Sequence, residues 1–141
     1  MRDLEFAKNS LKEKSLSLVI VKAGKLVYET REYGVIGIIK AIENHGEELV
    51  GASAADRVVG RAAAMLCRHA GIVAVYADVI SEPGLKTLRE SGIIIEYSKL
   101  VPEILDKNRK DKCPFEKLVA DCRNEEECYR KIKEYLNPIR Q

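Results

Sequence analysis

The sequence is poor in three features that would each point to a class of protein: net charge, cysteine and long apolar runs. Its 141 residues carry 24 Lys and Arg against 22 Asp and Glu, a formal net charge of +2. Non-specific binding of nucleic acid depends on a strong positive field, which this balance does not supply. We therefore do not expect nucleic acid to be the partner.

No apolar run approaches the roughly 20 residues that cross a bilayer. The first residues, 1–5, include acids that a signal peptide would not carry. With 46% hydrophobic and 33% charged residues, the composition is typical of a soluble globular protein. We expect a cytoplasmic protein with no membrane partner.

The four cysteines are too few and too unevenly spaced for a secreted disulfide scaffold, and in a reducing cytosol they are thiols. A disulfide between Cys122 and Cys128 is an open alternative, because the single glutamine and the many Lys, Glu and Ile residues resemble hyperthermophile compositions. Zinc would need further ligands, and Cys113 is the one credible third, so we predict no metal and no cofactor. Cys67 is expected in the core.

Apolar periodicity predicts the elements of the first half of the chain. Leu4, Ala7 and Leu11 predict a helix over 3–14, and β-branched runs over 16–21 and 26–30 predict a hairpin. A short helix is expected over 35–43. The run 53–56 (Ser-Ala-Ala-Asp) predicts the start of a helix that continues to His69, because a hydroxyl and an acid suit a first turn.

The second half alternates strands and helices. Residues 72–80 are almost continuously apolar and predict a central strand; 81–83 start a helix that Gly92 ends, and 93–97 predict another strand. Two helices are expected from about 113 and after 124. The order predicts one domain over 1–141, a three-layer α/β/α sandwich around a mixed sheet of about four to five strands.

This order resembles the cytidine-deaminase-like fold. In the family with that fold, the helix after the hairpin opens with a His or Cys and a Glu, and the next helix opens with Pro-Cys-x-x-Cys. Three of these residues hold zinc. Matched to 53–64 and 81–87, those motifs are missing: Asp56 replaces the His-x-Glu pair, and Gly84 and Thr87 replace the cysteines. The resemblance implies the frame of a deaminase without its metal.

More narrowly, residues 55–64 (Ala-Asp-Arg-Val-Val-Gly-Arg-Ala-Ala-Ala) and 113–118 (Cys-Pro-Phe-Glu-Lys-Leu) resemble a small family of uncharacterised prokaryotic proteins. That family has a deaminase-like fold without the metal site. The resemblance spans roughly 15–119 and implies a fold but no reaction.

Cys113 is the candidate nucleophile. It stands at or before the N-cap of a predicted helix, with Pro114 at the first helical position and Glu116 in the first turn. The positive helix end and the lysines nearby favour a thiolate. The alternative is that Cys113 is only a small residue at a helix entry and that Glu116 is a capping acid.

Asp56 is the second catalytic candidate, as a polar assistant, and a first-turn acid is its structural alternative. Arg57 and Arg61, one turn apart on the predicted helix, are candidates to clamp a phosphate or carboxylate. Surface ion pairs are the alternative for both arginines.

A ligand pocket is predicted where two helices begin, at Ser53 and Ser81, because helix N-termini bind anions without a metal. Glu82 and Thr87 stand beside the second start, and together with Glu116 they join the candidate ligand-binding residues. The acids in this region, Asp56 and Glu82 among them, argue against a simple anion site.

Two functions from different classes remain open. The first is a metal-free deaminase-like domain that binds a small ligand, nucleotide-like or anionic, or a protein partner. The second is a thiol-dependent enzyme, such as a transferase, that uses Cys113. A homo-oligomer is also an open expectation, through an edge formed by the Ile-rich strand.

Overall fold

The computed structural model describes residues 2–140, and their side chains up to Asn137. The elements follow in the order α1 (Arg2–Glu13), β1 (Leu18–Lys22), β2 (Lys25–Thr30), α2 (Ile36–His45), the 3₁₀ turn η1 (Gly46–Leu49), β3 (Ser53–Val59), α3 (Arg61–Ala70), β4 (Ala74–Ser81), α4 (Glu82–Glu90), β5 (Ile94–Val101), α5 (Pro114–Val119) and α6 (Glu125–Arg140).

One mixed sheet holds all five strands, in the spatial order β2-β1-β3-β4-β5. β1 runs antiparallel to both β2 and β3, whereas β3, β4 and β5 are parallel. The part of the sheet formed by β3, β4 and β5 is therefore built from strand–helix–strand units, as the continuous apolar run of β4 indicated. The predicted mixed α/β sheet is confirmed.

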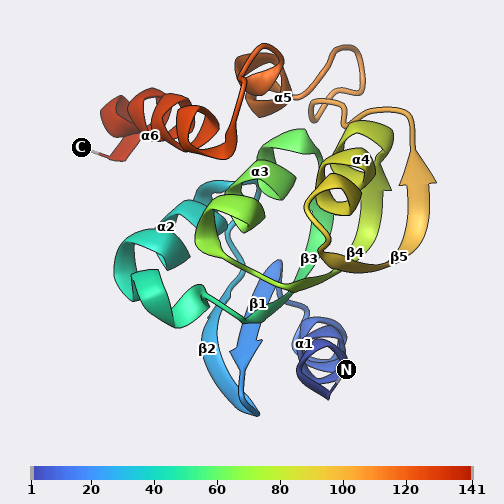
Figure 1. The fold of residues 1–141 in the computed structure, drawn as a ribbon. Helices are drawn as coiled ribbons and strands as arrows, with labels where there is room; N and C mark the ends of the chain where they lie inside the picture. The colour runs from blue at the N-terminus through green and yellow to red at the C-terminus, as the bar shows by residue number, and fades with distance from the viewer. Residues whose placement is uncertain (1, 141) are drawn as a thin grey trace.

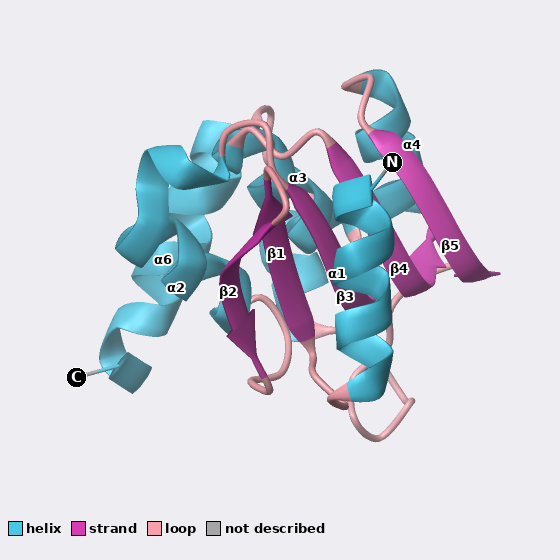
Figure 2. Ribbon diagram, turned by 90° about the horizontal axis from the view of Figure 1, so that it is seen from below, coloured by secondary structure: helices cyan, strands magenta, loops and turns pink. Residues whose placement is uncertain are grey.

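Helices cover the two faces of the sheet unequally. Figures 1 and 2 show α1 alone on one face and α2, α3 and α4 on the other, with α6 lying over the same side as α3. The core divides accordingly, because neighbouring strand residues point to opposite faces. Ala54 of β3 belongs to the larger cluster under α2–α4, and Ala55 belongs to the smaller cluster under α1. The three-layer arrangement is confirmed.

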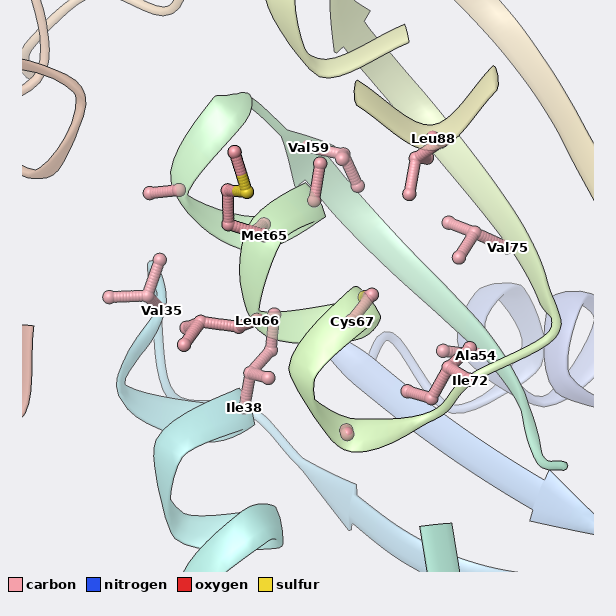
Figure 3. Packing of buried hydrophobic residues seen from close by; sticks show 14 of the residues in the cluster. Val35, Ile38, Ala54, Val59, Met65, Leu66, Cys67, Ile72, Val75 and Leu88 are labelled. Carbon is pink, nitrogen blue, oxygen red and sulfur yellow. The ribbon is translucent and has the colours of Figure 1, made fainter. Parts of the chain in front are cut away.

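The larger cluster is centred on α3 (Figure 3). Leu66 of this helix is fully buried and lies beside Ile38 of α2 (Figure 3), in a cluster that also holds Ala54 and Val75 of the sheet. A side chain of this size contributes about 1.5–3 kcal/mol when it leaves water. The alanines over 62–64 are buried too, and their small size lets α3 lie close to the strands.

The helix predicted from Ser53 is wrong over its first seven residues. Ser53–Val59 form β3, whose residues Ser53 and Asp56 pair with Val21 and Leu18 of β1. The helix begins only at Arg61, after Gly60 in an extended conformation. The Ser-Ala-Ala-Asp signal is local, and central strand pairing between β1 and β4 outweighs it.

The other predicted elements are present with shifted ends. The hairpin turns at Ala23 and Gly24, both with positive φ, and the Asp3 carboxylate accepts hydrogen bonds from both of their N–H groups, each at 2.9 Å. β5 continues to Val101, four residues beyond the predicted strand. None of the described helices has the length and apolarity to cross a membrane.

Candidate functional site

A small cavity of about 90 Å³ lies where β3 ends and α3 begins. Four segments form its walls: the residue before β1, the end of β3 with the start of α3, the turn before α2, and the region that enters α5. Its lining residues are Ser17, Tyr33, Gly34, Val35, Asp56, Arg57, Val58, Gly60, Ala63, Ile104, Cys113, Phe115 and Glu116. The structure thus brings four of the predicted site residues, Asp56, Arg57, Cys113 and Glu116, to one cavity.

Asp56 lines this cavity, and its surroundings shift the pKa of its carboxyl. Burial raises the pKa of its carboxyl from 3.8 to about 7; hydrogen bonds from the N–H groups of Val58 and Arg57 oppose the shift, and Asp78 adds to it. The bond from Val58 is long, at 3.4 Å. Near neutral pH the side chain therefore exchanges between an acid that donates a hydrogen bond and a carboxylate that accepts one.

Glu116 closes the start of α3. Its carboxylate oxygens accept hydrogen bonds from the N–H groups of Arg61 and Ala62, at 2.7 and 2.8 Å. Gly60 makes room for this cap, since a Cβ at that position would lie 2.4 Å from a Glu116 oxygen. Glu116 is therefore a capping acid, as foreseen, but it caps α3 and not its own helix α5. The N–H groups of Arg61 and Ala62 already have hydrogen-bond partners as a result.

The two arginines are held by the protein itself. Arg57 donates to the carbonyls of Leu11 and Leu16, at 2.9 and 2.8 Å, and to the Asp78 carboxylate at 2.7 Å. Arg61 donates to the carbonyls of Val119 and Cys122. Because Arg57 lies in a strand and Arg61 starts a helix, the predicted one-turn spacing on a single helix is wrong. These contacts tie α1 and the end of α5 to the sheet and α3.

Cys113 is the N-cap of α5, and its N–H donates to the carbonyl of Ile104 at 2.9 Å. The residue is half-buried, in contrast to Cys67, Cys122 and Cys128, which are buried. Lys117, one of the lysines whose positive charge was expected to favour a thiolate, forms an ion pair with Asp111 instead. Cys113 therefore combines access from outside with a place on the cavity wall.

A second, larger hollow of about 580 Å³ opens outside the cavity. The two hollows share Tyr33, Gly34, Cys113 and Phe115 in their walls. Phe115 meets Tyr135 edge to face, with ring centroids 5.6 Å apart, and Tyr33 is 82% exposed. We call this hollow the aromatic groove; its apolar character also comes from Ile36, Leu105 and Leu136.

Sequence reasoning missed the aromatic groove. Tyr33 lies in a loop and Tyr135 in a helix that begins more than ninety residues later, so no spacing connects them. Phe115 stood within the 113–118 motif, and its place two residues after Cys113 was the one available signal.

The remaining predicted residues lie elsewhere. Ser53 is buried at the opposite, amino end of β3 from the cavity, and its hydroxyl has no hydrogen-bond partner among the described residues. Ser81 is the N-cap of α4, accepting from the N–H of Gly84 at 3.0 Å. The predicted pocket between helix starts at Ser53 and Ser81 is therefore wrong, because Ser53 starts a strand.

Glu82 and Thr87 line a separate polar groove of about 670 Å³ between α3 and α4, together with Arg61 and Arg68. The Thr87 hydroxyl donates to the Pro83 carbonyl at 2.8 Å, a bond within its own helix. The structure does not bring these residues to the cavity of Asp56 and Cys113.

The topology also corrects the placing of the deaminase motifs. The two helices that follow the hairpin are α2 and α3, so the motif positions fall at the starts of these helices, one helix earlier than the sequence match assumed. Those starts read Val35-Ile36-Gly37 and Gly60-Arg61-Ala62, and neither holds a zinc ligand. Over residues 2–140, no group of three or more His, Cys, Asp or Glu could hold a metal ion.

All four cysteines are thiols. The Cys122 and Cys128 side chains are in hydrogen-bond contact, and burial together with Cys122 raises the pKa of Cys128 to about 12. Burial likewise raises the pKa of Cys67. The disulfide left open from the sequence is not formed.

Comparison with known proteins identifies a family model and a solved structure that match most of the chain. The family model for a domain of unknown function, DUF1893 (TM1506), matches residues 6–136. The crystal structure of a DUF1893 family protein from Thermotoga maritima superposes with a TM-score of 0.87 at 30% identity, covering 95% of this chain and 90% of that one. No curated protein matches the sequence.

Two further structures are more distant in sequence. RibD of Acinetobacter baumannii has a TM-score of 0.51 at 19% identity, over 69% of this chain and 35% of that one. A diaminohydroxyphosphoribosylaminopyrimidine deaminase/5-amino-6-(5-phosphoribosylamino)uracil reductase of Thermotoga maritima gives 0.51 at 18% identity, with the same coverage. This chain thus spans about a third of their length. The likeness shows the deaminase-like fold alone.

Proposed function

The chain belongs to the DUF1893 family of domains of unknown function, and we propose that it uses its deaminase-like fold to bind a small planar ligand beside Cys113. The observation that carries the proposal is the pair of adjoining hollows, an aromatic groove that leads past Cys113 to a cavity containing Asp56. Binding sites of this kind are largely apolar and hold a few convergent polar groups.

The two hollows differ in what they accept. The aromatic groove presents Tyr33, Phe115 and Tyr135, whose rings offer faces and edges to a flat ring system. The cavity is smaller than the roughly 150 Å³ that admits a benzene molecule. We infer that the ring system lies in the groove and that only a small polar group, such as an amino group or ring N–H, reaches Asp56.

The charges around the cavity favour a neutral ligand end over an anionic one. Glu116 already bonds the free N–H groups at the start of α3, so an anion would have to displace a carboxylate there. Asp56 adds negative charge when ionised. A nucleobase-like heterocycle fits these conditions better than a phosphate does.

Thermal unfolding with added ligands tests the proposal. Adenosine, guanosine and cytidine are the probes, and inorganic phosphate is the comparison. A bound nucleoside at 100 times its Kd stabilises the fold by about 2.7 kcal/mol, which raises Tm by roughly 9 °C for a chain of this length. Stabilisation by phosphate and by none of the nucleosides would overturn the proposal.

Tyr33→Ala is the variant that examines the groove. Loss of one stacking ring weakens binding by roughly tenfold, since such contacts are worth about 1–3 kcal/mol. Phe6→Ala is the matched control, because Phe6 is a partly exposed aromatic residue on α1, across the sheet from the groove. Equal loss of affinity in both variants would contradict the location.

The second candidate function, thiol-dependent catalysis, depends on one observation: Cys113 borders both hollows. A nucleophilic Cys113 reacts with iodoacetamide at pH 6–7 much faster than a free cysteine peptide, whose thiol has an ordinary pKa of about 8.5. Labelling at the rate of the peptide would contradict catalysis by Cys113, and ligand binding would then be the one function proposed.

A further inference from the structure

We infer that two copies of this chain pair along β5, antiparallel, about a two-fold axis that passes through Tyr97. The five-stranded sheets would then join into one continuous sheet of both subunits. This inference is independent of the ligand site, which lies at the end of β3 and around Cys113.

β5 is an open edge of unusual regularity. It stands last in the sheet and, among residues 2–140, pairs with β4 alone (Figures 1 and 2). Seven of its eight residues pair with β4 in one register, and Ile94 and Leu100 are 51% and 42% exposed. Proteins usually blunt such an edge, because it invites pairing with another strand.

The opposite edge, β2, is blunted. Its register with β1 shifts between Ile20 and Val21, whereas the pairing of β5 with β4 has no such shift. An irregular edge resists pairing. The contrast indicates that β5 is the edge that the fold leaves available.

The backbone of β5 shows which groups are available. The N–H of Ile94 donates to the carbonyl of Val73 at 3.0 Å, so Ile94 turns its polar groups inward. Alternate residues of a parallel strand face the same neighbour, and the outward residues are therefore Ile95, Tyr97, Lys99 and Val101. Their N–H and C=O groups form a row that an antiparallel strand can bond.

A second copy of β5 fits this row. A two-fold axis perpendicular to the sheet keeps like faces together, so inward residues meet inward ones and outward residues meet outward ones. Centred on Tyr97, the register sets the exposed Ile94 against Leu100 of the partner subunit and Tyr97 against Tyr97 of the partner subunit. Apolar pairs and aromatic pairs of this kind stabilise adjacent strands.

The neighbouring register is worse. Centred on Ser98, it would place Glu96 directly against Leu100 of the partner subunit and leave the exposed Ile94 opposite a position beyond the end of β5. The favoured register places Glu96 against Ser98 of the partner subunit and Ile95 against Lys99 of the partner subunit, and Lys8 already neutralises Glu96 through an ion pair of 2.5 Å. The favoured register therefore covers the two exposed apolar residues of β5 with each other, which is why we assign a second copy as the occupant.

Cysteine cross-linking tests the axis. In a Cys113→Ser background, Tyr97→Cys places two thiols on a directly opposed pair with Cα atoms about 5.5 Å apart, within disulfide range. Lys99→Cys is the matched control, because its two copies lie about 14 Å apart at a rise of about 3.4 Å per residue. We expect an oxidised dimer from Tyr97→Cys alone; equal cross-linking of both variants would overturn the axis.

Association measurements test the edge itself. Lys99→Pro removes an outward N–H and no bond to β4, whereas Lys99→Ala keeps that N–H. Sedimentation equilibrium should show a wild-type dimer, retained in Lys99→Ala and weakened about 30-fold in Lys99→Pro, because symmetry removes two hydrogen bonds. Far-ultraviolet circular dichroism checks that both variants fold. A wild-type monomer at high protein concentration would overturn the inference.

Discussion

Asp56 shows how a strand changes the chemistry of a single residue. At the start of a helix its carboxylate would have been solvated and stabilised by backbone N–H groups. In β3 the same side chain points toward α3 and lines a small cavity beside Cys113. Burial then raises its pKa to about 7, so its proton is exchanged at the pH of a cell.

This shift makes stability depend on pH in a defined direction. The folded protein holds a proton on Asp56 that the unfolded chain releases above about pH 4, so stability falls as pH rises from about 4 to about 7. Asp56→Asn removes the ionisable group and keeps an acceptor for the Val58 N–H. We expect the variant to gain about 1–3 kcal/mol over the wild type at pH 8 and little at pH 4.5.

Urea unfolding at the two pH values measures the gain. Asp121→Asn is the control, because Asp121 is exposed and its ion pair with Lys131 lowers its pKa. That variant should show no gain at pH 8. A pH-independent difference between Asp56→Asn and the wild type would show that Asp56 is ionised throughout the folded state.

At the scale of elements, the starts of α3 and α4 lie backbone against backbone. A Cβ on Gly84 would approach the carbonyl oxygen of Val59 to 2.9 Å and the carbonyl carbon of Gly60 to 3.0 Å. No side chain can move aside to relieve such contacts, since the obstructing atoms are backbone. Gly84, which the deaminase match set in place of a cysteine, therefore allows the two helix starts to meet.

Gly84→Ala should separate these helix starts. We expect a loss of about 1–3 kcal/mol in the free energy of unfolding, the usual cost of an added carbon in a packed interior. Lys86→Ala on the same helix is the control, because Lys86 is exposed, and it should change stability by less than about 0.5 kcal/mol. Similar values for the two variants would mean that the helix starts can move apart freely.

Sequence patterns predicted most elements because their signals were local and agreed with the fold. Apolar β4, the Ser81 cap and the Cys113-Pro114 entry each announce an element through neighbouring residues. The error at Ser53–Val59 arose where a local helix signal competed with strand pairing across the chain. The meeting of Tyr33 with Phe115 and Tyr135 depends on tertiary packing alone, which no local pattern records.

At the scale of the molecule, the two faces of the sheet differ in what covers them. One face is covered by α1, and Arg57 bonds the carbonyls at the end of α1 and before β1. The other face carries α2, α3 and α4, with α5 and α6 beyond (Figure 1). Both hollows of the proposed site take walls from the turn before α2 and from the entry to α5. The site therefore depends on how firmly the C-terminal helices hold to α3.

The reactivity of the buried cysteines shows how firmly α5 and α6 are attached to α3. Cys67 of α3, Cys122 after α5 and Cys128 of α6 belong to one hydrophobic cluster, which also holds Val119 and Leu136. If α5 and α6 unfold together with the sheet, all three thiols become reactive at the same denaturant concentration. We expect this common transition, because the cluster is continuous from the strands to α6.

Pulsed alkylation across a urea series, followed by mass spectrometry, measures the urea concentration at which each thiol becomes reactive. Cys113 should react in the absence of urea, and the other three together at the global midpoint, after correction for their rates in the unfolded chain. Alkylation of Cys122 and Cys128 at concentrations that leave Cys67 protected would instead show that the C-terminal helices open by themselves. Phe115, Glu116 and Cys113 would then leave α3 with them, and ligand entry would be coupled to that opening rather than to unfolding of the sheet.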